Sequence, residues 1–151
     1  MPMLLVFVGK TKEGFINDGI GKYLGLLKRQ TKIEVREIKG SSKSGPDAVR
    51  EEGASILERV APSDYLIALH ERGSNPDSVE LAGKLAPIME QGRNIVFAVG
   101  GPFGLSGDVL ARADYKLSLS RLTFTHEMAR LILLEQIYRA FTIIQGRTYH
   151  Y

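Results

Sequence analysis

The sequence predicts an α/β fold in which a mostly parallel sheet is flanked by helices. Short apolar runs of strand length alternate along the chain with longer segments whose apolar residues recur at helical spacing. The chain has 151 residues, 44% of them hydrophobic and 25% charged, which suits a globular unit with a sizeable core. Because no linker or internal repeat divides the chain, we expect one domain over residues 1–151.

The first half of the chain contains three predicted strands and two predicted helices. Continuous apolar or β-branched runs predict the strands, at residues 3–8, 32–38 and 65–69. Helical spacing of apolar residues predicts a helix over 15–29, although three glycines weaken it. A second helix is expected from Pro46, a residue suited to the first turn, to about Val60. The basic, serine-rich stretch 39–45 before it is expected to be a loop.

The second half continues the alternation and supplies three polar loops. Strands are expected at 94–99 and 115–119, and helices at 78–91, 106–112 and 126–144. The loops that follow the last three strands cover residues 70–77, 100–107 and 120–125. Because ligands of parallel α/β sheets bind outside the carboxyl ends of the strands, these loops mark the predicted binding site.

The last predicted helix is apolar around nearly its whole circumference. Thr125 can cap it, and Glu127 lies in its first turn, where the helix dipole favours a carboxylate. Either the helix is enclosed by the fold or it buries a second face against a partner subunit. We expect a homodimer, because a chain of this length has little room to enclose a helix fully.

Composition excludes several classes of site. No apolar run is long enough for a membrane span, and the apolar N-terminus lacks the features of a signal peptide, so we expect a cytoplasmic protein without membrane contact. The absence of cysteine removes disulfides and thiolate metal sites, and no His-x-x-x-His or carboxylate cluster suggests a metal. The net charge of +3 and the pI near 9.2 favour anionic partners only mildly.

Two stretches near the predicted site carry unusual patterns. The first, "VFAVGGPFGLSG" (96–107), lacks both the Gly-Lys-Ser/Thr ending of a P-loop and the spacing of a dinucleotide fingerprint. It is either a tight strand-to-helix turn or a backbone wall for a ligand. The second, "LSLSRLTFT" (117–125), alternates hydroxyl and apolar residues, as expected of a strand that continues into the wall of a groove.

Histidines and arginines near the end of the chain are candidates for chemistry. The three histidines are His70, His126 and His150, and the helix dipole disfavours protonation of His126. The tail "GRTYHY" can stack on a base and contact phosphate, or it can be a frayed terminus. Arg121, Arg130 and Arg139 add cations, and the spacing of Glu135 and Arg139 predicts a surface ion pair.

In combination, these stretches resemble a known family. "VGGPFGLS", "LSLSRLTFTHEMARLILLEQIYRAFTIIQG", the "YH" of the tail, "LLVFVGK" and "DYLIALHERG" are similar to the bacterial large-subunit rRNA pseudouridine N3-methyltransferases, which belong to the knotted SPOUT methyltransferases. The resemblance spans essentially the whole chain. It implies an α/β fold with a C-terminal trefoil knot, a homodimer, and S-adenosylmethionine (S-adenosyl-L-methionine) bound in the knot.

The resemblance also implies roles for individual residues. Cofactor contacts are expected from Leu69, Gly100, Gly101, Leu119, Ser120, Arg121, Leu122, Thr123, Phe124 and Thr125. The implied substrate is a pseudouridine of large-subunit rRNA in the assembled ribosome, methylated at N3. The expected base is His150 or His126, with Arg139 or Arg130 near phosphate or oxygen and Tyr149 stacked on the target base.

Three positions depart from the family pattern, and two other functions remain open. Phe103 stands where the family has an acid, Thr125 where it has proline, and Tyr151 where a basic residue follows the Tyr-His pair. The first alternative is a SPOUT enzyme of another RNA such as tRNA, although the chain has no appended RNA-binding module. The second is a non-enzymatic α/β module that binds a nucleoside.

Overall fold

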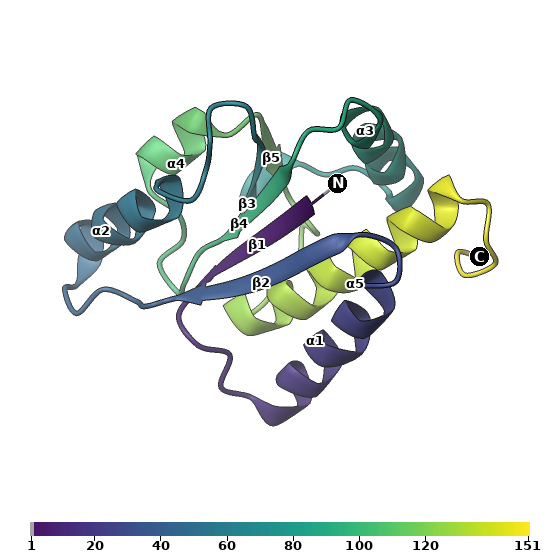
Figure 1. Cartoon of the computed structure of the whole chain (residues 1–151). Coiled ribbons are helices and arrows are strands. Elements are labelled where there is room, and N and C mark those ends of the chain that lie inside the picture. The colour runs from purple at the N-terminus through teal and green to yellow at the C-terminus, as the bar shows by residue number, and fades with distance from the viewer. Residues whose placement is uncertain (1) are drawn as a thin grey trace.

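A computed structural model describes residues 2–151 as a five-stranded sheet with helices on both faces (Figure 1). The strands are β1 (Pro2–Val8), β2 (Lys32–Ile38), β3 (Tyr65–Ser74), β4 (Ile95–Val99) and β5 (Tyr115–Leu117). The helices are α1 (Gly14–Leu27), α2 (Gly45–Leu57), α3 (Ser78–Glu90), α4 (Gly107–Arg112) and α5 (His126–Ile144). The sheet order is β2-β1-β4-β3-β5 and all neighbouring strands are parallel, which confirms the predicted fold class.

The two faces of the sheet belong to two separate cores. On β1, Leu5 and Phe7 point to one face and Val6 and Val8 to the other, and all four are buried. The first face is covered by α1, α3 and α5, and the second by α2 and α4 (Figure 1). All five residues of β4 are buried, which explains why this strand is a continuous apolar run.

Helix α5 is covered on most of its circumference, but not all of it, by its own chain. It lies between α1 and α3 and packs on the sheet, with buried residues along its whole length (Figure 1). The approach to α1 is close: a β-carbon built on Gly19 would lie 2.7 Å from Leu131 Cδ1. Packing within one chain accounts for most of the apolar circumference of α5, but Ile132 and Ile143 stay half-buried, so the helix is not fully enclosed. The homodimer itself stays a prediction.

Two predicted boundaries near the carboxyl end of the sheet are wrong. β3 continues to Ser74 through most of the predicted loop 70–77, because Ser118 N donates to Ser74 O (2.8 Å) and extends the pairing with β5. The predicted strand continuation after β5 does not form: β5 ends at Leu117 and the segment 118–125 is irregular.

The hydroxyls of segment 118–125 explain why it leaves the sheet. Ser118 Oγ donates to Ser120 O (3.0 Å), and Ser120 Oγ accepts from Leu122 N (2.9 Å). Short polar side chains that bond to nearby backbone in this way compete with a strand ladder. Elsewhere the helices differ from expectation only at their ends, since α1 ends at Leu27 and α2 at Leu57. Among residues 2–151, no helix has the length and apolar character that a membrane crossing needs.

Gly73 offers a test of the β3–β5 pairing. A β-carbon built there would lie 2.6 Å from Lys116 O and 2.7 Å from Lys116 C, both backbone atoms of the neighbouring strand. We expect Gly73→Ala to lower the free energy of unfolding by about 1 to 3 kcal/mol in chemical denaturation. The matched control is Gly83→Ala in α3, where a β-carbon meets nothing within 4 Å. It should raise stability by about 0.5 to 1 kcal/mol, and a Gly73 variant as stable as that control would contradict the close packing.

Candidate functional site

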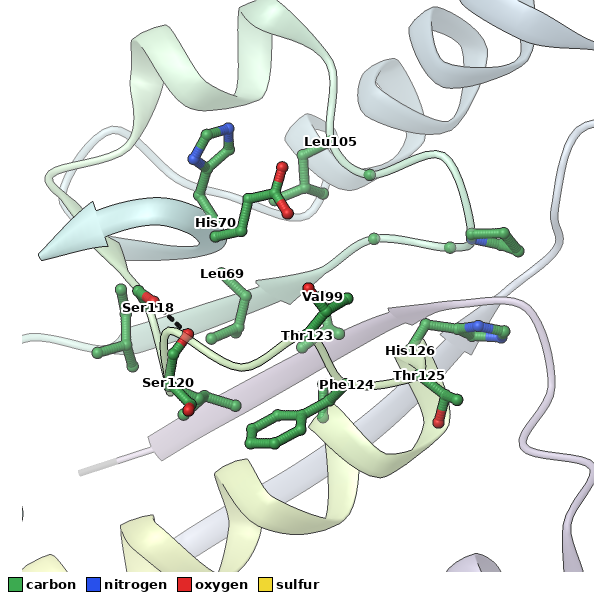
Figure 2. Close-up of a pocket in the computed structure, with 18 of the residues that line it drawn as sticks. Leu69, His70, Val99, Leu105, Ser118, Ser120, Thr123, Phe124, Thr125 and His126 are labelled. Atoms are coloured by element: carbon green, nitrogen blue, oxygen red, sulfur yellow. Dashed lines mark hydrogen bonds between the residues drawn. The ribbon is translucent and has the colours of Figure 1, made fainter. Parts of the chain in front are cut away.

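A cavity of about 630 Å³ lies at the carboxyl ends of β3, β4 and β5. Figure 2 shows that its walls come from three parts of the chain. The lining consists of residues 69–71 on β3, the loop 99–105 after β4, residues 117–120 and 122–126 after β5, and Ala129 on α5. A volume of this size is typical of a small-molecule site, and the position matches the one predicted from the sheet topology.

The glycine loop after β4 is both a tight turn and a wall of the cavity. Gly104 N donates to Gly101 O (3.0 Å), and Gly104 has a φ of +81°, which favours glycine. A β-carbon built on Gly100 would lie 2.6 Å from the carbonyl carbon of Gly104. The loop is therefore the predicted tight turn and it also lines the cavity, whereas contact of its backbone with a ligand stays a prediction. Phe103, at the rim, is 73% exposed.

The segment after β5 forms the opposite wall. Ser118 is buried, accepts from Asn75 Nδ2 (3.3 Å), and donates to Ser120 O as Figure 2 shows. Leu119 packs against the core under the sheet, whereas Leu122 is 75% exposed. This wall therefore offers backbone groups, hydroxyls and apolar side chains to a ligand, and no formal charge.

His126 opens α5 at the edge of the cavity. Thr125 caps the helix, since its Oγ1 accepts from Met128 N (3.2 Å), so threonine serves where the family pattern has proline. Partial burial lowers the pKa of His126, and the nearby cations Arg130 and Lys12 lower it further, while Glu127 opposes them. The imidazole is therefore neutral at pH 7 and can accept a proton or a hydrogen bond.

Arg130 lies in the same helix but behind the cavity wall. Its side chain is fully buried and donates to Val8 O (2.7 Å) and Thr11 Oγ1 (2.8 Å). It does not line the cavity. Of the residues expected to contact the cofactor, Arg121 is exposed and outside the lining, and all the others line the cavity.

A second cluster lies at the far end of α5. Arg139 donates to Glu135 through Nε (3.1 Å) and Nη2 (2.5 Å), and its guanidinium lies 4.7 Å from the centre of the Tyr149 ring. Arg139 Nη1 also lies 3.1 Å from His150 Nδ1, and Tyr149 OH donates to Glu135 (3.1 Å). Burial, together with Tyr23 and Glu135, raises the pKa of Tyr149. These contacts hold the tail onto α5 and leave His150 exposed.

The expected catalytic residues are therefore split between two places. Arg139 follows His126 by thirteen residues on one helix, which separates them by about 20 Å along the axis. Figure 1 shows the C-terminus at the end of α5 opposite to its start. Within one chain, His126 reaches the cavity, whereas Arg139, Tyr149 and His150 do not.

Sequence reasoning missed the shared role of Glu135. Its spacing to Arg139 predicts the ion pair that is observed, but not that Tyr149 from the tail shares the same carboxylate. The pair is also only partly exposed, with 24% and 19% of the two side chains accessible, so it is not a simple surface pair. Among residues 2–151, no group of histidine and carboxylate side chains could hold a metal ion.

Comparisons with known proteins show the family to which the chain belongs. A family model described as "Predicted SPOUT methyltransferase" matches residues 1–150. The chain is 42% identical to Ribosomal RNA large subunit methyltransferase H of Desulfotalea psychrophila, with 97% of each chain covered. It is 41% identical to the protein of the same name from Geobacter metallireducens, with 100% of this chain and 99% of the relative covered.

A solved structure shows the same fold at low sequence identity. A methylase family protein from Neisseria gonorrhoeae superposes with a TM-score of 0.53 and 13% identity, over 91% of this chain and 81% of the other. At that identity the likeness concerns the arrangement of strands and helices alone.

The pKa of His126 predicts a pH dependence of stability. Because the pKa in the folded protein is below the ordinary value of 6.5, the unfolded chain binds more protons at His126 between the two values. The contribution of His126 to the free energy of unfolding is thus fully present above pH 6.5 and is lost as the pH falls toward the lowered pKa. Glu127 titrates lower, since its pKa lies below 4.5.

We expect this loss to disappear in His126→Gln. Thermal unfolding from about pH 7.5 to about pH 5.5 should lower the Tm of the wild type more than that of the variant. An NMR titration should place the pKa of His126 below 6.5. Equal slopes of Tm against pH in the two proteins would contradict the assignment.

Proposed function

The chain belongs to the SPOUT methyltransferase family, and we propose that it transfers a methyl group from S-adenosylmethionine to N3 of a pseudouridine in large-subunit rRNA. The observation that carries the proposal is the cavity at the carboxyl ends of β3, β4 and β5, with its glycine and hydroxyl walls. The full-length relatives named as large-subunit rRNA methyltransferases supply the class of substrate. The proposed enzyme is a single domain that acts on the ribosome in the cytoplasm.

The cavity suits the proposed cofactor in size and in chemistry. Gly100 and Gly101 line the cavity without a side chain, and the segment 118–125 adds hydroxyls and carbonyls. Leu69 and Phe124 provide apolar surface in the same lining. When bound, the cofactor supplies an electrophilic methyl group on a sulfonium, so the reaction needs no metal from the protein. A trefoil knot that includes segment 118–125 is part of the proposal.

The remaining task for the protein is to prepare the nitrogen nucleophile. The N3–H of pseudouridine is weakly acidic, so a protein side chain has to accept its proton. The negative charge that develops on the nucleobase has to be stabilised at the same time. We assign the proton acceptor to His126 or His150, and charge stabilisation to Arg139. Tyr149 would stack on the target base. Arg130 is fully buried, so any contribution it makes acts through its neighbours.

The separation of the two clusters supports a homodimer. Because Arg139, Tyr149 and His150 lie about 20 Å from His126 along α5, one chain cannot bring them to its own cavity. A second copy can supply its tail to the cavity of the first, which makes each site composite. Phe103 and Leu122, both exposed at the rim, offer apolar surface for that contact or for the RNA.

Single alanine variants of His126 and His150 test the chemistry. We expect the variant that removes the base to lose methyl transfer by about a hundredfold or more. The assay measures, by mass spectrometry, methylated pseudouridine in large-subunit rRNA of ribosomes taken from cells that lack the protein. Near-wild-type rates in both variants would overturn the assignment of the base.

Methylation of free tRNA but not of ribosomes would favour a different RNA substrate, and failure to bind S-adenosylhomocysteine in calorimetry would favour a non-enzymatic module.

Mixed dimers test whether the site is composite. Gly100→Ala damages the cavity and Arg139→Ala damages the tail cluster, and each variant alone should be folded but inactive. After the two are unfolded, mixed in equal amounts and refolded, we expect about a quarter of the wild-type activity, since half of the dimers are mixed and each has one intact site. Absence of any recovery, with mixed dimers shown by mass spectrometry, would mean that each site lies within one chain.

A further inference from the structure

The chain segment that links β1 to α1 is bound along its length by the first two turns of α5. Arg130 donates to Val8 O (2.7 Å) and to Thr11 Oγ1 (2.8 Å). Both carboxylate oxygens of Glu127 lie 3.1 Å from Lys12 N, and Oε1 also accepts from Glu13 N (3.0 Å). Two side chains one helical turn apart therefore bind four groups of the segment 8–13, on residues 8, 11, 12 and 13, more than a hundred residues away in sequence.

The same segment touches the other wall of the cavity. A β-carbon built on Gly101 would lie 3.5 Å from Val8 Cγ1 and 3.8 Å from Val8 O, the oxygen that Arg130 binds. Gly101 and the α5 residues His126 and Ala129 line the cavity. Val8 is thus the common support of the glycine loop on one side and the start of α5 on the other.

We propose that Glu127 and Arg130 are positioning residues of the cavity, which fix the start of α5 relative to the glycine loop by binding segment 8–13. Neither side chain lines the cavity, so each acts through the backbone that it holds. The proposal rests on the proposed function only for the identity of the ligand.

The cost of this arrangement supports a role beyond folding. Arg130 is fully buried, and its Nε has no hydrogen-bond partner among the described residues. Its ion pair with Glu37 is long, at 3.7 Å, and the Phe7 ring lies 4.9 Å from the guanidinium. Burying a charge costs free energy that its partners only partly return, so apolar side chains of similar volume often stabilise a core equally well. Apolar residues, however, cannot form hydrogen bonds that hold backbone atoms such as Val8 O at a fixed position.

Glu127→Ala tests the proposal, with Asp64→Ala as the matched control. Asp64 is also a buried carboxylate that accepts a backbone N–H, from Ala61 (2.8 Å), but it lies just before β3, at the end of that strand opposite to the cavity. We expect both variants to lose similar stability in chemical denaturation. Only Glu127→Ala should weaken binding of S-adenosylhomocysteine in calorimetry, by about tenfold, the equivalent of one charge-assisted hydrogen bond. Glu127→Gln, which keeps one acceptor, should restore part of the affinity.

Hydrogen exchange provides a readout that needs no ligand. In Glu127→Ala, amides of residues 100–104 and 118–126 should exchange faster than in the wild type, and in Asp64→Ala they should not. Equal affinity and equal exchange in the wild type and Glu127→Ala would overturn the positioning role. If the wild type does not bind S-adenosylhomocysteine, the proposed function fails, and the exchange data alone decide the positioning role.

Discussion

The place of α5 in the fold is the constraint on which the site depends. The strand before it, β5, lies at one edge of the sheet, whereas α5 packs under the middle of the sheet between α1 and α3. The chain therefore has to return from the edge across the carboxyl ends of β3 and β4. That return path is segment 118–125, and the cavity lies between it and the loop after β4. The packing of the core and the position of the cavity thus both follow from where α5 lies in the fold.

The same constraint explains the chemistry of the walls. A segment that crosses strand ends cannot join the sheet, so its backbone groups need local partners, and Ser118 and Ser120 supply them. The loop after β4 has to turn sharply to leave room for this crossing, and only glycine fits at positions 100 and 104. Backbone and hydroxyl groups suit a neutral, flat ligand such as a nucleoside. The path of segment 118–125 across the strand ends therefore also explains which chemical groups line the cavity.

Sequence patterns predicted the structural features that depend on residues close together in the chain. The buried strands and the amphipathic helices follow from apolar periodicity, and Thr125 caps α5 as its position in the sequence predicts. One error falls where a distant segment decides: Ser74 stays in β3 because Ser118 pairs with it. The other, the predicted strand beyond Leu117, fails because serine hydroxyls bond to the nearby backbone. Likewise, the sequence gives no sign that Arg130 binds Val8, or that Tyr149 shares Glu135 with Arg139. The resemblance to a family named the residues expected to contact the cofactor, and all of them except Arg121 line the cavity, which periodicity alone could only place at strand ends.

The two ends of α5 have complementary chemical character, which bears on how two copies could meet. Its start has a neutral imidazole beside a cavity whose lining includes the carboxylate of Glu71, and its end has the cationic Arg139 with Tyr149 and His150. In a dimer whose two-fold axis passes perpendicular to α5 near its middle, the start of one helix faces the end of the other, and this occurs twice. Such symmetry would bring a cation and an aromatic ring to each cavity without any change within either chain. It would also place the outward surface of α5 at the interface, where Ile132 and Arg139 are only half-buried. A helix enclosed on three sides by its own chain thus still has one side suited to a partner. The reason is that such a dimer would bring the end of each α5 to the cavity of the other chain.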